Sequence, residues 1–366
     1  MAPLGKKIIV TLLLILGSLS IFRTTHILWN SLLPDFSIFY ISTKALLEGD
    51  NPYLLKDLFT QLNYPPTSLM FFIPLAFFSL SFASKIWILV SICFFVVSVY
   101  FLHIITKSTL LHTSFLFFIF AISFPLKFTL GMGQVNMLLL LALTLFLYFI
   151  HNKREKVSAI FLSLSVIVKL YPALFYLLVV ITKRWKILGV SVLIILFITL
   201  ISLLLIDSKI YMYYLNNILI PLLTEVEKGE YYNQALSATF KRFGIEGTSV
   251  FLRLILLIIT MLVISKRGRI FERFSLLLIT ILLINAFTWQ HHLVLMLIPA
   301  FILIKEKSKT KLTFLIIGLA LIISNMKNVF SNNDLINSIY LSHVTIGMVI
   351  IWILQFIRLQ NEVKKP

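Results

Sequence analysis

The chain has 366 residues, of which 60% are hydrophobic and only 13% charged, and its formal net charge is +18. A soluble domain is roughly 45–50% apolar and about 25% charged. The apolar residues come in long uncharged blocks such as 8–21 and 187–206, and about 20 such residues span a bilayer as one helix. A single soluble domain is therefore excluded. The sequence predicts an all-α membrane protein that crosses the bilayer many times.

The positive charge is concentrated in short clusters between the apolar blocks. These clusters are 153-KREK, 183-KRWK, 266-KRGR, 305-KEKSKTK and 364-KK. Basic residues in short loops mark the cytoplasmic side of a membrane protein, so the charge indicates orientation and not a nucleic-acid partner. It predicts a plasma (inner) membrane protein with both termini in the cytoplasm. The single cysteine, Cys93, lies in an apolar run, which excludes a disulfide framework.

The first helix is expected at about 7–28. Lys6 and Lys7 before an apolar stretch also fit a signal peptide, but no small-residue cleavage site follows, so we expect the helix to be retained. The segment 29–66 then forms a first external loop. The stretch 66–106 must make an odd number of crossings, yet its pattern indicates two helices divided near Ser81–Ser84. Residues 112–150 form a hairpin whose outer turn is 131-GMGQVN.

The stretch 157–182 lies between two basic clusters, so the chain must enter the membrane and return. Each half has only about 12 residues, or about 18 Å of helix, which is too short to cross about 30 Å of hydrocarbon. The break falls at 169-KLYP, where Pro172 interrupts the helical hydrogen bonds. We therefore predict a re-entrant pair of half-helices with Lys169 at its apex, since irregular backbone at that depth requires burial in protein or a wet cavity.

The rest of the chain alternates between the two sides. Residues 187–206 lead out to a second large external loop at 207–246, and 248–265 lead back. The later segments are 272–288, 293–304, 312–329 and 338–357. Eleven to thirteen membrane segments result, in a single transmembrane domain of residues 1–366 with no soluble domain and no convincing repeat. The last 60 residues add only helices.

This topology places several polar motifs together on the outer side. They are 34-PDFSIFY, 64-YPP, 131-GMGQVN, 169-KLYP, 233-NQALSATFKR and 289-WQHH. Polar and ionisable groups at membrane depth cost free energy unless they are paired. Their convergence therefore predicts a polar cavity that opens on the outer side.

The ionisable residues each have a structural alternative. Asp35 could cap a helix that starts near Ser37. Lys169 could extend its ammonium to the membrane interface. His291 and His292 could be interfacial anchors in an aromatic belt.

The remaining motifs also have structural alternatives. Gln134 and Asn136 could be interhelical hydrogen-bonding residues, Arg242 could lie on a solvated loop, and Tyr64 could belong to a helix start. No zinc-type ligand cluster, Gly-rich phosphate loop or nucleophile elbow occurs in the sequence.

Taken in order, the motifs form a pattern. It consists of Asp35-Phe36, Tyr40, Gly49 with 52-PY, 64-YPP, Trp87, 133-GQVN, 169-KLYP, 183-KRWK, 233-NQAL, Arg242 and 289-WQHH. From about residue 30 to 300 this pattern resembles the polyprenol-phosphate-mannose-dependent mannosyltransferases of glycosyltransferase family 87, within the GT-C superfamily.

The resemblance implies a GT-C helical bundle whose first external loop folds over a cavity at the membrane surface. The donor would be a polyprenyl-phosphate sugar, with mannose as the family's default. The acceptor would be a hydroxyl of a lipid-linked or extracytoplasmic glycan. Asp35 would be the catalytic base, and the donor phosphate would meet Lys169, Arg242, His291 and His292. The expected sugar- and acceptor-binding residues are Tyr40, Tyr64, Gln134, Asn136, Asn233, Gln234 and Trp289.

The residue types suit this chemistry. A sugar hydroxyl needs a carboxylate to accept its proton as it attacks C1, and the leaving phosphate needs cations and donors. A retaining double displacement would need a second carboxylate, so one carboxylate predicts inversion. Asp35 is followed by Phe36 and Ser37 instead of a second acid, so no cofactor or divalent cation is expected, although Asp50, Asp57 and 225-EVEKGE add other acids.

Two other classes remain open. A transporter or flippase of lipid-linked sugars would also use broken helices with a charge near mid-membrane, although the repeats usual in transporters are not found. A structural or regulatory membrane subunit is the third possibility.

Overall fold

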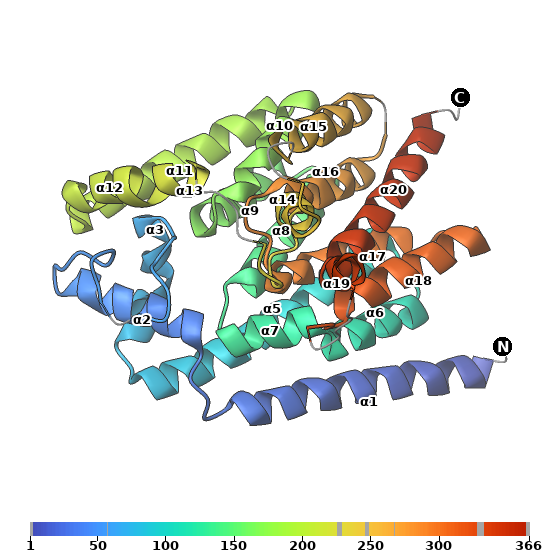
Figure 1. Ribbon diagram of the computed structural model, residues 1–366, viewed down its shortest axis with the longest axis horizontal. Helices are drawn as coiled ribbons and strands as arrows, with labels where there is room; N and C mark the ends of the chain where they lie inside the picture. Colours follow the sequence, from blue (N-terminus) through green and yellow to red (C-terminus); the bar gives the residue numbers. More distant parts are fainter. Residues whose placement is uncertain are drawn as a thin grey trace.

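The computed structural model describes residues 3–56, 58–224, 229–245, 249–266, 268–327 and 333–363. Across these ranges the regular structure is helical (Figure 1), apart from one isolated antiparallel bridge between Asn233 and Trp289. Asp57 and residues 225–228, which the sequence analysis names as further acids, lie outside the described residues. The prediction of an all-α fold is confirmed.

By length and composition, four described helices suit a membrane crossing. These are Leu4–Leu28, Leu80–Thr106, Trp185–Leu205 and His343–Asn361. The pair Leu110–Ile122 and Phe124–Met132, bent by 54°, forms a possible fifth crossing, and five shorter apolar helices accompany them. The chain is therefore a polytopic membrane protein.

The N-terminal half begins with α1 (Pro3–Leu28), as predicted. Helix α1 packs on α6 (Leu110–Ile122), where Ser20 donates to the Ala121 carbonyl at 3.0 Å. The packing is close at Gly17, because an added Cβ would lie 2.6 Å from Phe117 Cε1. The segment 29–66, predicted as the first external loop, contains α2 (Pro34–Leu47).

The two helical stretches expected in 66–106 are present, but they are divided a few residues before Ser81–Ser84. Short helices α3 (Pro66–Leu69), η1 (Met70–Phe72) and α4 (Ile73–Ala76) precede a single 27-residue helix, α5 (Leu80–Thr106). The break lies at 77–79, where the Ser79 side chain caps α5 by accepting from the Phe82 amide. Ser84 lies inside the helix and donates to the Leu80 carbonyl. Within 66–106, α5 has the length and composition of a membrane crossing, and Pro66–Ala76 is too short for one.

The hairpin predicted at 112–150 is confirmed. It consists of α6, α7 (Phe124–Met132) and α8 (Asn136–His151), with Gly133–Val135 as the turn. The bend between α6 and α7 falls at Ser123, which caps α7, and Pro125 stands in the first turn of α7.

The break predicted at 169-KLYP is present, and the chain turns back there. Helix α9 (Glu155–Val168) breaks at Lys169, and the chain continues as η2 (Tyr171–Leu174) and α10 (Phe175–Ile181) before α11 (Trp185–Leu205). Arg184 Nη1 lies 2.8 Å from Glu155 Oε1. A continuous helix would separate these residues by roughly 40 Å, so the segment starts and ends on the same side.

The remaining helices follow in order. They are α12 (Ser208–Tyr214), the π-helical η3 (Leu215–Leu219), α13 (Ile220–Thr224), α14 (Leu236–Arg242), α15 (Ser249–Ser265), α16 (Ile270–Ile284), η4 (Gln290–Met296), α17 (Leu297–Leu303), α18 (Lys309–Ile323), α19 (Asp334–Leu341) and α20 (His343–Val363). Three ranges differ from prediction: α16 ends four residues early, α18 ends at Ile323, and α19 is separate from α20.

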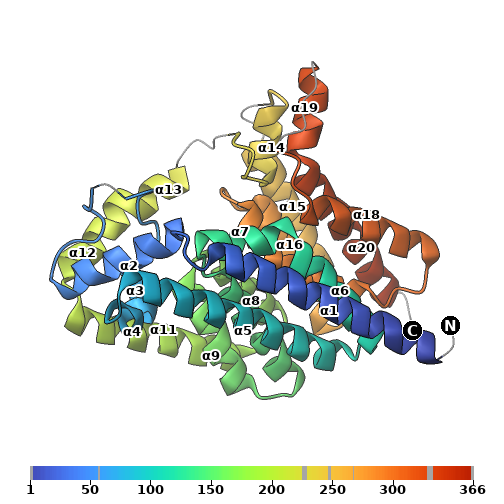
Figure 2. The same ribbon diagram turned by 90° about the horizontal axis from the view of Figure 1, so that it is seen from below.

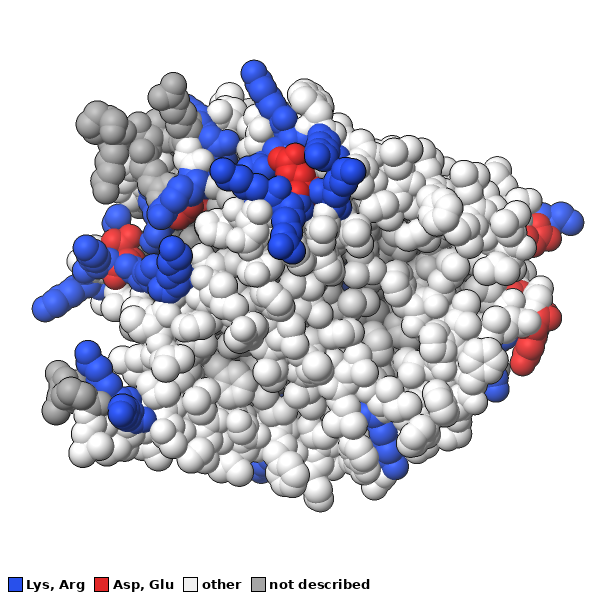
Figure 3. Space-filling view, turned by 180° about the vertical axis from the view of Figure 1, so that it is seen from behind, with Lys and Arg blue, Asp and Glu red and all other residues white. Residues whose placement is uncertain are grey.

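Charge is unevenly distributed over the surface. The start of α1 and the end of α20 lie at the same end of the molecule (Figures 1 and 2). Lys and Arg side chains gather at that end and along one edge, whereas a broad neighbouring face is almost uncharged (Figure 3). This separation suits a protein with an apolar belt and basic loops.

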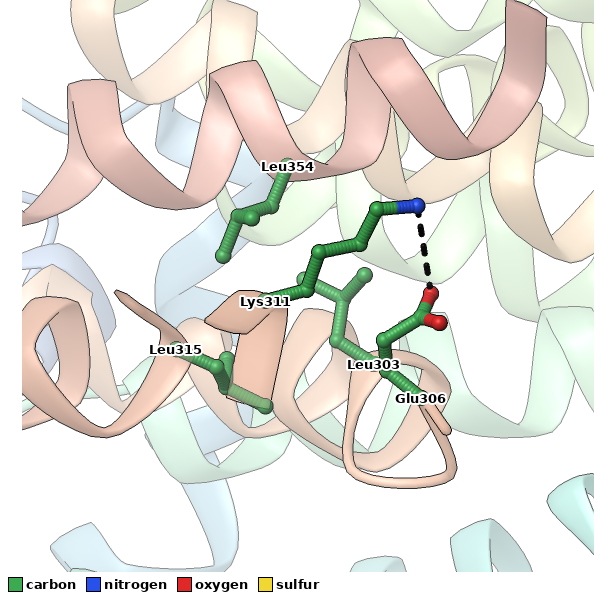
Figure 4. A pocket seen from close by; sticks show the side chains of 5 residues that line it. All are labelled: Leu303, Glu306, Lys311, Leu315 and Leu354. Carbon is green, nitrogen blue, oxygen red and sulfur yellow. Dashed lines mark ion pairs between the residues drawn. The ribbon is translucent and has the colours of Figure 1, made fainter. Parts of the chain in front are cut away.

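A small hollow lies among α17, α18 and α20 (Figure 4). Its volume of about 10 Å³ is no larger than one water molecule requires. Lys311 Nζ lies 3.8 Å from Glu306 Oε2 at its rim, and Arg358 Nη1 lies 4.0 Å from the same oxygen. These ion pairs join the α17–α18 connection to α20, which is a structural role.

Candidate active site

A cavity of about 1490 Å³ lies between α2, the 59–65 loop, the α7–α8 turn, the break at Lys169 and η4. Drug-sized ligands occupy sites of roughly 300–1,000 Å³, so this cavity has room for more than one substrate. Of the twelve site residues expected from the sequence, eight line it. They are Asp35, Tyr64, Gln134, Lys169, Asn233, Trp289, His291 and His292.

Asp35 stands in the first turn of α2, which begins at Pro34. The N-cap residue is Leu33, and no side chain caps the helix, so the capping alternative for Asp35 is wrong. Its Oδ2 instead accepts a 2.5 Å hydrogen bond from Gln134 Nε2. Gln134 Oε1 in turn accepts from the Tyr64 hydroxyl at 2.9 Å. Gln134 thus joins the carboxylate to Tyr64, and its amide is oriented because an ionised carboxylate only accepts.

The α7–α8 turn is held tightly against α2. Gly133 has φ +70°, and an added Cβ would lie 2.5 Å from Phe36 Cβ, so this position requires glycine for both conformation and space. The Gly133 carbonyl accepts from Trp87 Nε1 at 2.8 Å. The Trp87 ring also stacks on Phe36, with centroids 5.9 Å apart. This packing places Gln134 beside Asp35.

Lys169 occupies the break in the re-entrant pair. Its backbone is extended, with φ −144° and ψ 143°, and only 7% of the residue is exposed. Its Nζ donates to Asn136 Oδ1 at 2.9 Å and lies 2.8 Å from His292 Nε2. The same Nζ is 5.5 Å from the centre of the Tyr64 ring. These contacts hold the Lys169 ammonium inside the protein. The alternative that it extends to the membrane interface is therefore wrong.

His291 and His292 are both buried and both line the cavity. The interfacial-anchor alternative is therefore wrong. They begin a 3₁₀-helix, η4, and their rings form an edge-to-face pair with centroids 4.7 Å apart. The Nδ1 atom of each is buried without a hydrogen-bond partner in the described part of the chain. Each ring therefore has a buried nitrogen that no described group engages.

Asn136 does not line the cavity but orients the groups that do. Its Oδ1 accepts from Lys169, and its Nδ2 donates to the His291 carbonyl at 3.2 Å. Asn136 thus connects the re-entrant pair to η4.

Besides Asn136, three expected site residues lie outside the cavity lining. Arg242 donates to the Asn233 carbonyl at 2.9 Å and to Ser342 Oγ at 2.9 Å, among other bonds. Burial lowers the pKa of Arg242 to about 10, which leaves it a cation at neutral pH. Gln234 Nε2 donates to the Leu341 carbonyl at 2.8 Å. These two residues support the 229–245 segment, and the expectation that Arg242 meets the donor phosphate finds no geometric support.

Tyr40 is the third of these residues. Its hydroxyl donates to the Phe78 carbonyl at 2.7 Å, which attaches α2 to the connection before α5. Asn233 does reach the cavity wall, but its side chain bonds the Ala286 carbonyl and the amides of Ala235 and Thr288. Both residues stabilise the walls of the site.

Several lining residues were missed at the sequence level. Tyr171, inside the 169-KLYP motif, has a buried hydroxyl without a partner among the described residues, and its ring lies 5.7 Å from His292. Arg253 lines the cavity from α15, and an arginine inside an apolar helix is itself a signal of function. Phe128 and Tyr232 also line it, but nothing in their local sequence distinguishes them from core aromatics.

The surroundings of Asp35 alter its acidity. Burial raises the pKa of this carboxyl above its ordinary value of 3.8, while the Gln134 hydrogen bond and the charge of Lys169 act in the opposite direction. A carboxylate with a raised pKa is a better proton acceptor near neutral pH. The site therefore combines a basic carboxylate with a lysine and two imidazoles.

The fold and the cavity define a multi-pass membrane protein with a buried acid–base site. The model of glycosyltransferase family 87 matches residues 62–299, nearly two-thirds of the chain. The chain belongs to this family and is a membrane glycosyltransferase. No curated protein matches it. Asp35 precedes the matched range, so its assignment depends on its position in the cavity.

Proposed function

We propose that this protein transfers a sugar, mannose by default, from a polyprenyl-phosphate donor to a hydroxyl of a lipid-linked or extracytoplasmic glycan. The observation that carries the proposal is the composition of one cavity. It holds the Asp35 carboxylate and the Lys169–His292 pair, and it continues as an apolar surface along α10.

The apolar surface suits a lipid-linked donor. Leu170, Leu174, Leu177 and Ile181 line the cavity, and their spacing places them on one face of a helix. Met261 of α15 also lines this part of the cavity. Lys169 stands at one end of this surface. A polyprenyl phosphate requires a cation at its head and an aliphatic surface for its chain.

The reaction follows from the positions of the charged groups. Asp35 accepts the proton of the acceptor hydroxyl as its oxygen bonds to C1 of the donor sugar. The bond from C1 to the phosphate oxygen breaks, and polyprenyl phosphate leaves with both bonding electrons. Lys169 and the two histidines meet its charge. Direct displacement with a single carboxylate inverts the anomeric centre.

No divalent cation is needed in this proposal. Among the described residues, no group of three or more His, Cys, Asp or Glu side chains has the arrangement to hold a metal ion. Lys169 and the histidines supply the positive charge and hydrogen-bond donors that a metal would otherwise bring to the phosphate.

The active site is proposed to face the exterior of the plasma membrane, with both termini in the cytoplasm. The basic loops support this orientation. The Glu155–Arg184 ion pair belongs to the basic end of the re-entrant pair, and Lys169 lies at the opposite tip.

A transporter of lipid-linked sugars would use a similar broken helix pair. The family match and the hydrogen-bonded Asp35 favour transfer over transport. Purified protein in lipid, incubated with a panel of polyprenyl-phosphate sugars, should release polyprenyl phosphate from at least one donor. Counterflow of labelled donor across sealed vesicles without such release would support the transporter instead.

A further inference from the structure

One wall of the cavity is aromatic. Phe128 of α7, Tyr232 and Trp289 all line it, and each side chain is partly exposed. The ring centroids of Phe128 and Tyr232 lie 5.0 Å apart. His291 connects this pair to Trp289, with centroid distances of 5.2 Å to Phe128 and 6.4 Å to Trp289. We call Phe128, Tyr232 and Trp289 the aromatic wall.

The aromatic wall is held in place by the backbone of three segments. Gln234 N donates to the Thr288 carbonyl at 2.7 Å, and Gln290 N donates to the Tyr232 carbonyl at 2.9 Å. Thr129, next to Phe128, donates its hydroxyl to the His291 carbonyl at 2.8 Å. A surface fixed before binding loses little entropy when a ligand arrives. The aromatic wall is therefore preorganised.

The aromatic wall also offers polar atoms to a ligand. In the described part of the chain, no hydrogen bond engages the Tyr232 hydroxyl or the Trp289 indole N–H. Asn285, which also lines the cavity, uses its Nδ2 for the Phe287 carbonyl at 3.0 Å, which leaves its Oδ1 as an acceptor. Aromatic faces and hydrogen-bonding groups thus stand side by side.

A sugar ring matches this combination. It presents C–H groups on its faces, which suit the negative face of an aromatic ring, and hydroxyls at its edge. An isoprenoid chain has no use for the polar atoms, and the aliphatic face of α10 is the better match for it. The aromatic wall and the α10 face are two chemically different parts of one cavity.

We propose that the aromatic wall is the acceptor subsite and that it binds a sugar ring of a glycan acceptor. The ring stacks on Phe128 and Tyr232, and its hydroxyls bond Tyr232 and Trp289. The His291 ring packs against Phe128 of the aromatic wall on one side and against His292 on the other. A sugar bound at the wall therefore lies next to the proposed site of the donor phosphate. The inference rests on the proposed function and specifies its acceptor as a saccharide.

The test separates donor cleavage from transfer. Full-length protein in lipid nanodiscs is given a polyprenyl-phosphate sugar that it turns over, and release of polyprenyl phosphate is measured in water alone. The measurement is repeated with methyl glycosides of di- and trisaccharides of mannose, glucose and arabinose, and with octanol as an alcohol without a sugar ring. We expect a saccharide to accelerate release and to appear in the product, and octanol to have no effect.

Variants then locate the subsite. Tyr232→Ala and Phe128→Ala should each lower kcat/KM for the saccharide by about tenfold to a hundredfold, the effect of removing a central contact, and lower release in water by a clearly smaller factor. Tyr232→Phe should retain most of the transfer, because the ring remains. Phe149→Leu is the matched control. Phe149 stacks on Phe161 with ring centroids 5.4 Å apart, and neither residue lines the cavity, so its loss should not affect the saccharide.

Several results would overturn the inference. They are acceleration by octanol equal to that by saccharides, no acceleration by any saccharide, or an equal loss of transfer and release in the Ala variants. Unchanged transfer in those variants would overturn it as well. If no donor releases polyprenyl phosphate at all, the proposed function fails first and the acceptor subsite is withdrawn with it.

Discussion

Two irregular segments bring cationic or imidazole side chains to the cavity, and they differ in their surroundings. The break at Lys169 lies in a re-entrant pair at the edge of the bundle, where Leu170 and Val180 are each 41% exposed. The segment that starts with His291 and His292 continues into the centre of the bundle, where every residue from Leu293 to Leu303 is buried. The peripheral segment is suited to a lipid substrate, and the central one to a rigid support.

This comparison shows how one cavity combines lipid access with fixed geometry. The Lys169–His292 contact at 2.8 Å is the point where the two segments meet. A change in the peripheral segment should alter donor handling, whereas a change in the central one should also disturb the walls. The carboxylate comes from neither segment, because α2 supplies it. The predictions below test this division.

The largest effect is expected from Asp35→Asn, which keeps the shape of the side chain and removes its basicity. Loss of a general base typically costs about 10²–10⁴ in rate, so kcat should fall by that factor and donor binding should be retained. The measurement is product formation together with equilibrium donor binding. Near-normal turnover would show that Asp35 is not the general base. The base would then have to be sought in the two irregular segments, those of Lys169 and of the two histidines.

Lys169→Met should follow, because it removes the charge at the tip of the peripheral segment. A charge-assisted hydrogen bond is worth about 1.5–3 kcal/mol, or roughly ten- to a hundredfold in kcat/KM for the donor. Lys169→Arg is the control, since it keeps the charge and should recover part of the activity. Cysteine at position 169 should react with an impermeant reagent from the outside. Reaction from the cytoplasmic side alone would contradict the proposed orientation.

The histidines should differ from each other. His292 touches Lys169, and His291 packs against the aromatic wall, so His292→Ala should weaken donor use by about tenfold and His291→Ala less. His291→Ala should instead raise KM for the acceptor. Separate kinetics for the two substrates provide the measurement. Equal, wild-type behaviour of both variants would leave the phosphate to Lys169 without imidazole help.

A smaller effect concerns pH. Burial raises the pKa of Asp35, and the Gln134 hydrogen bond partly offsets this. Because the base must be deprotonated, activity should fall as pH drops through a value above 3.8, the ordinary value for this carboxyl. Gln134→Ala removes the offset and should move this acidic limb to higher pH. A limb that stays in place or moves to lower pH would show that Gln134 does not stabilise the carboxylate.

The smallest effect is expected from chelation. EDTA should leave product formation within about twofold of its untreated value, because Lys169 and the histidines provide the phosphate charge in place of a metal. Activity that is lost with EDTA and restored by Mg²⁺ or Mn²⁺ would contradict this. The acids outside the described residues, such as Asp57, would then be the first candidates for the metal ligands.

The sequence by itself determined the helical class and the break at 169-KLYP, because each depends on local composition and length. The 26 residues of 157–182, between two basic clusters, are too few for two helices that each cross the bilayer. The same local reasoning placed the division of 66–106 a few residues too late, near Ser81–Ser84, because Ser79 is the residue whose side chain caps the long helix.

Only the tertiary structure decided which polar side chains face the cavity and which support its walls. Arg242 and Gln234 stand in a motif of the family pattern, yet Ser342, Leu341 and Thr345 use their hydrogen-bonding groups. These partners come from the last 60 residues, for which the sequence predicted helices and no contribution to the site. The opposite holds for Phe128 and Tyr232. Their local sequence shows no sign of a role in the site, and the structure places them in the cavity lining. A hydrogen bond or a ring stack depends on a partner about a hundred residues away, and no local pattern records where that partner lies.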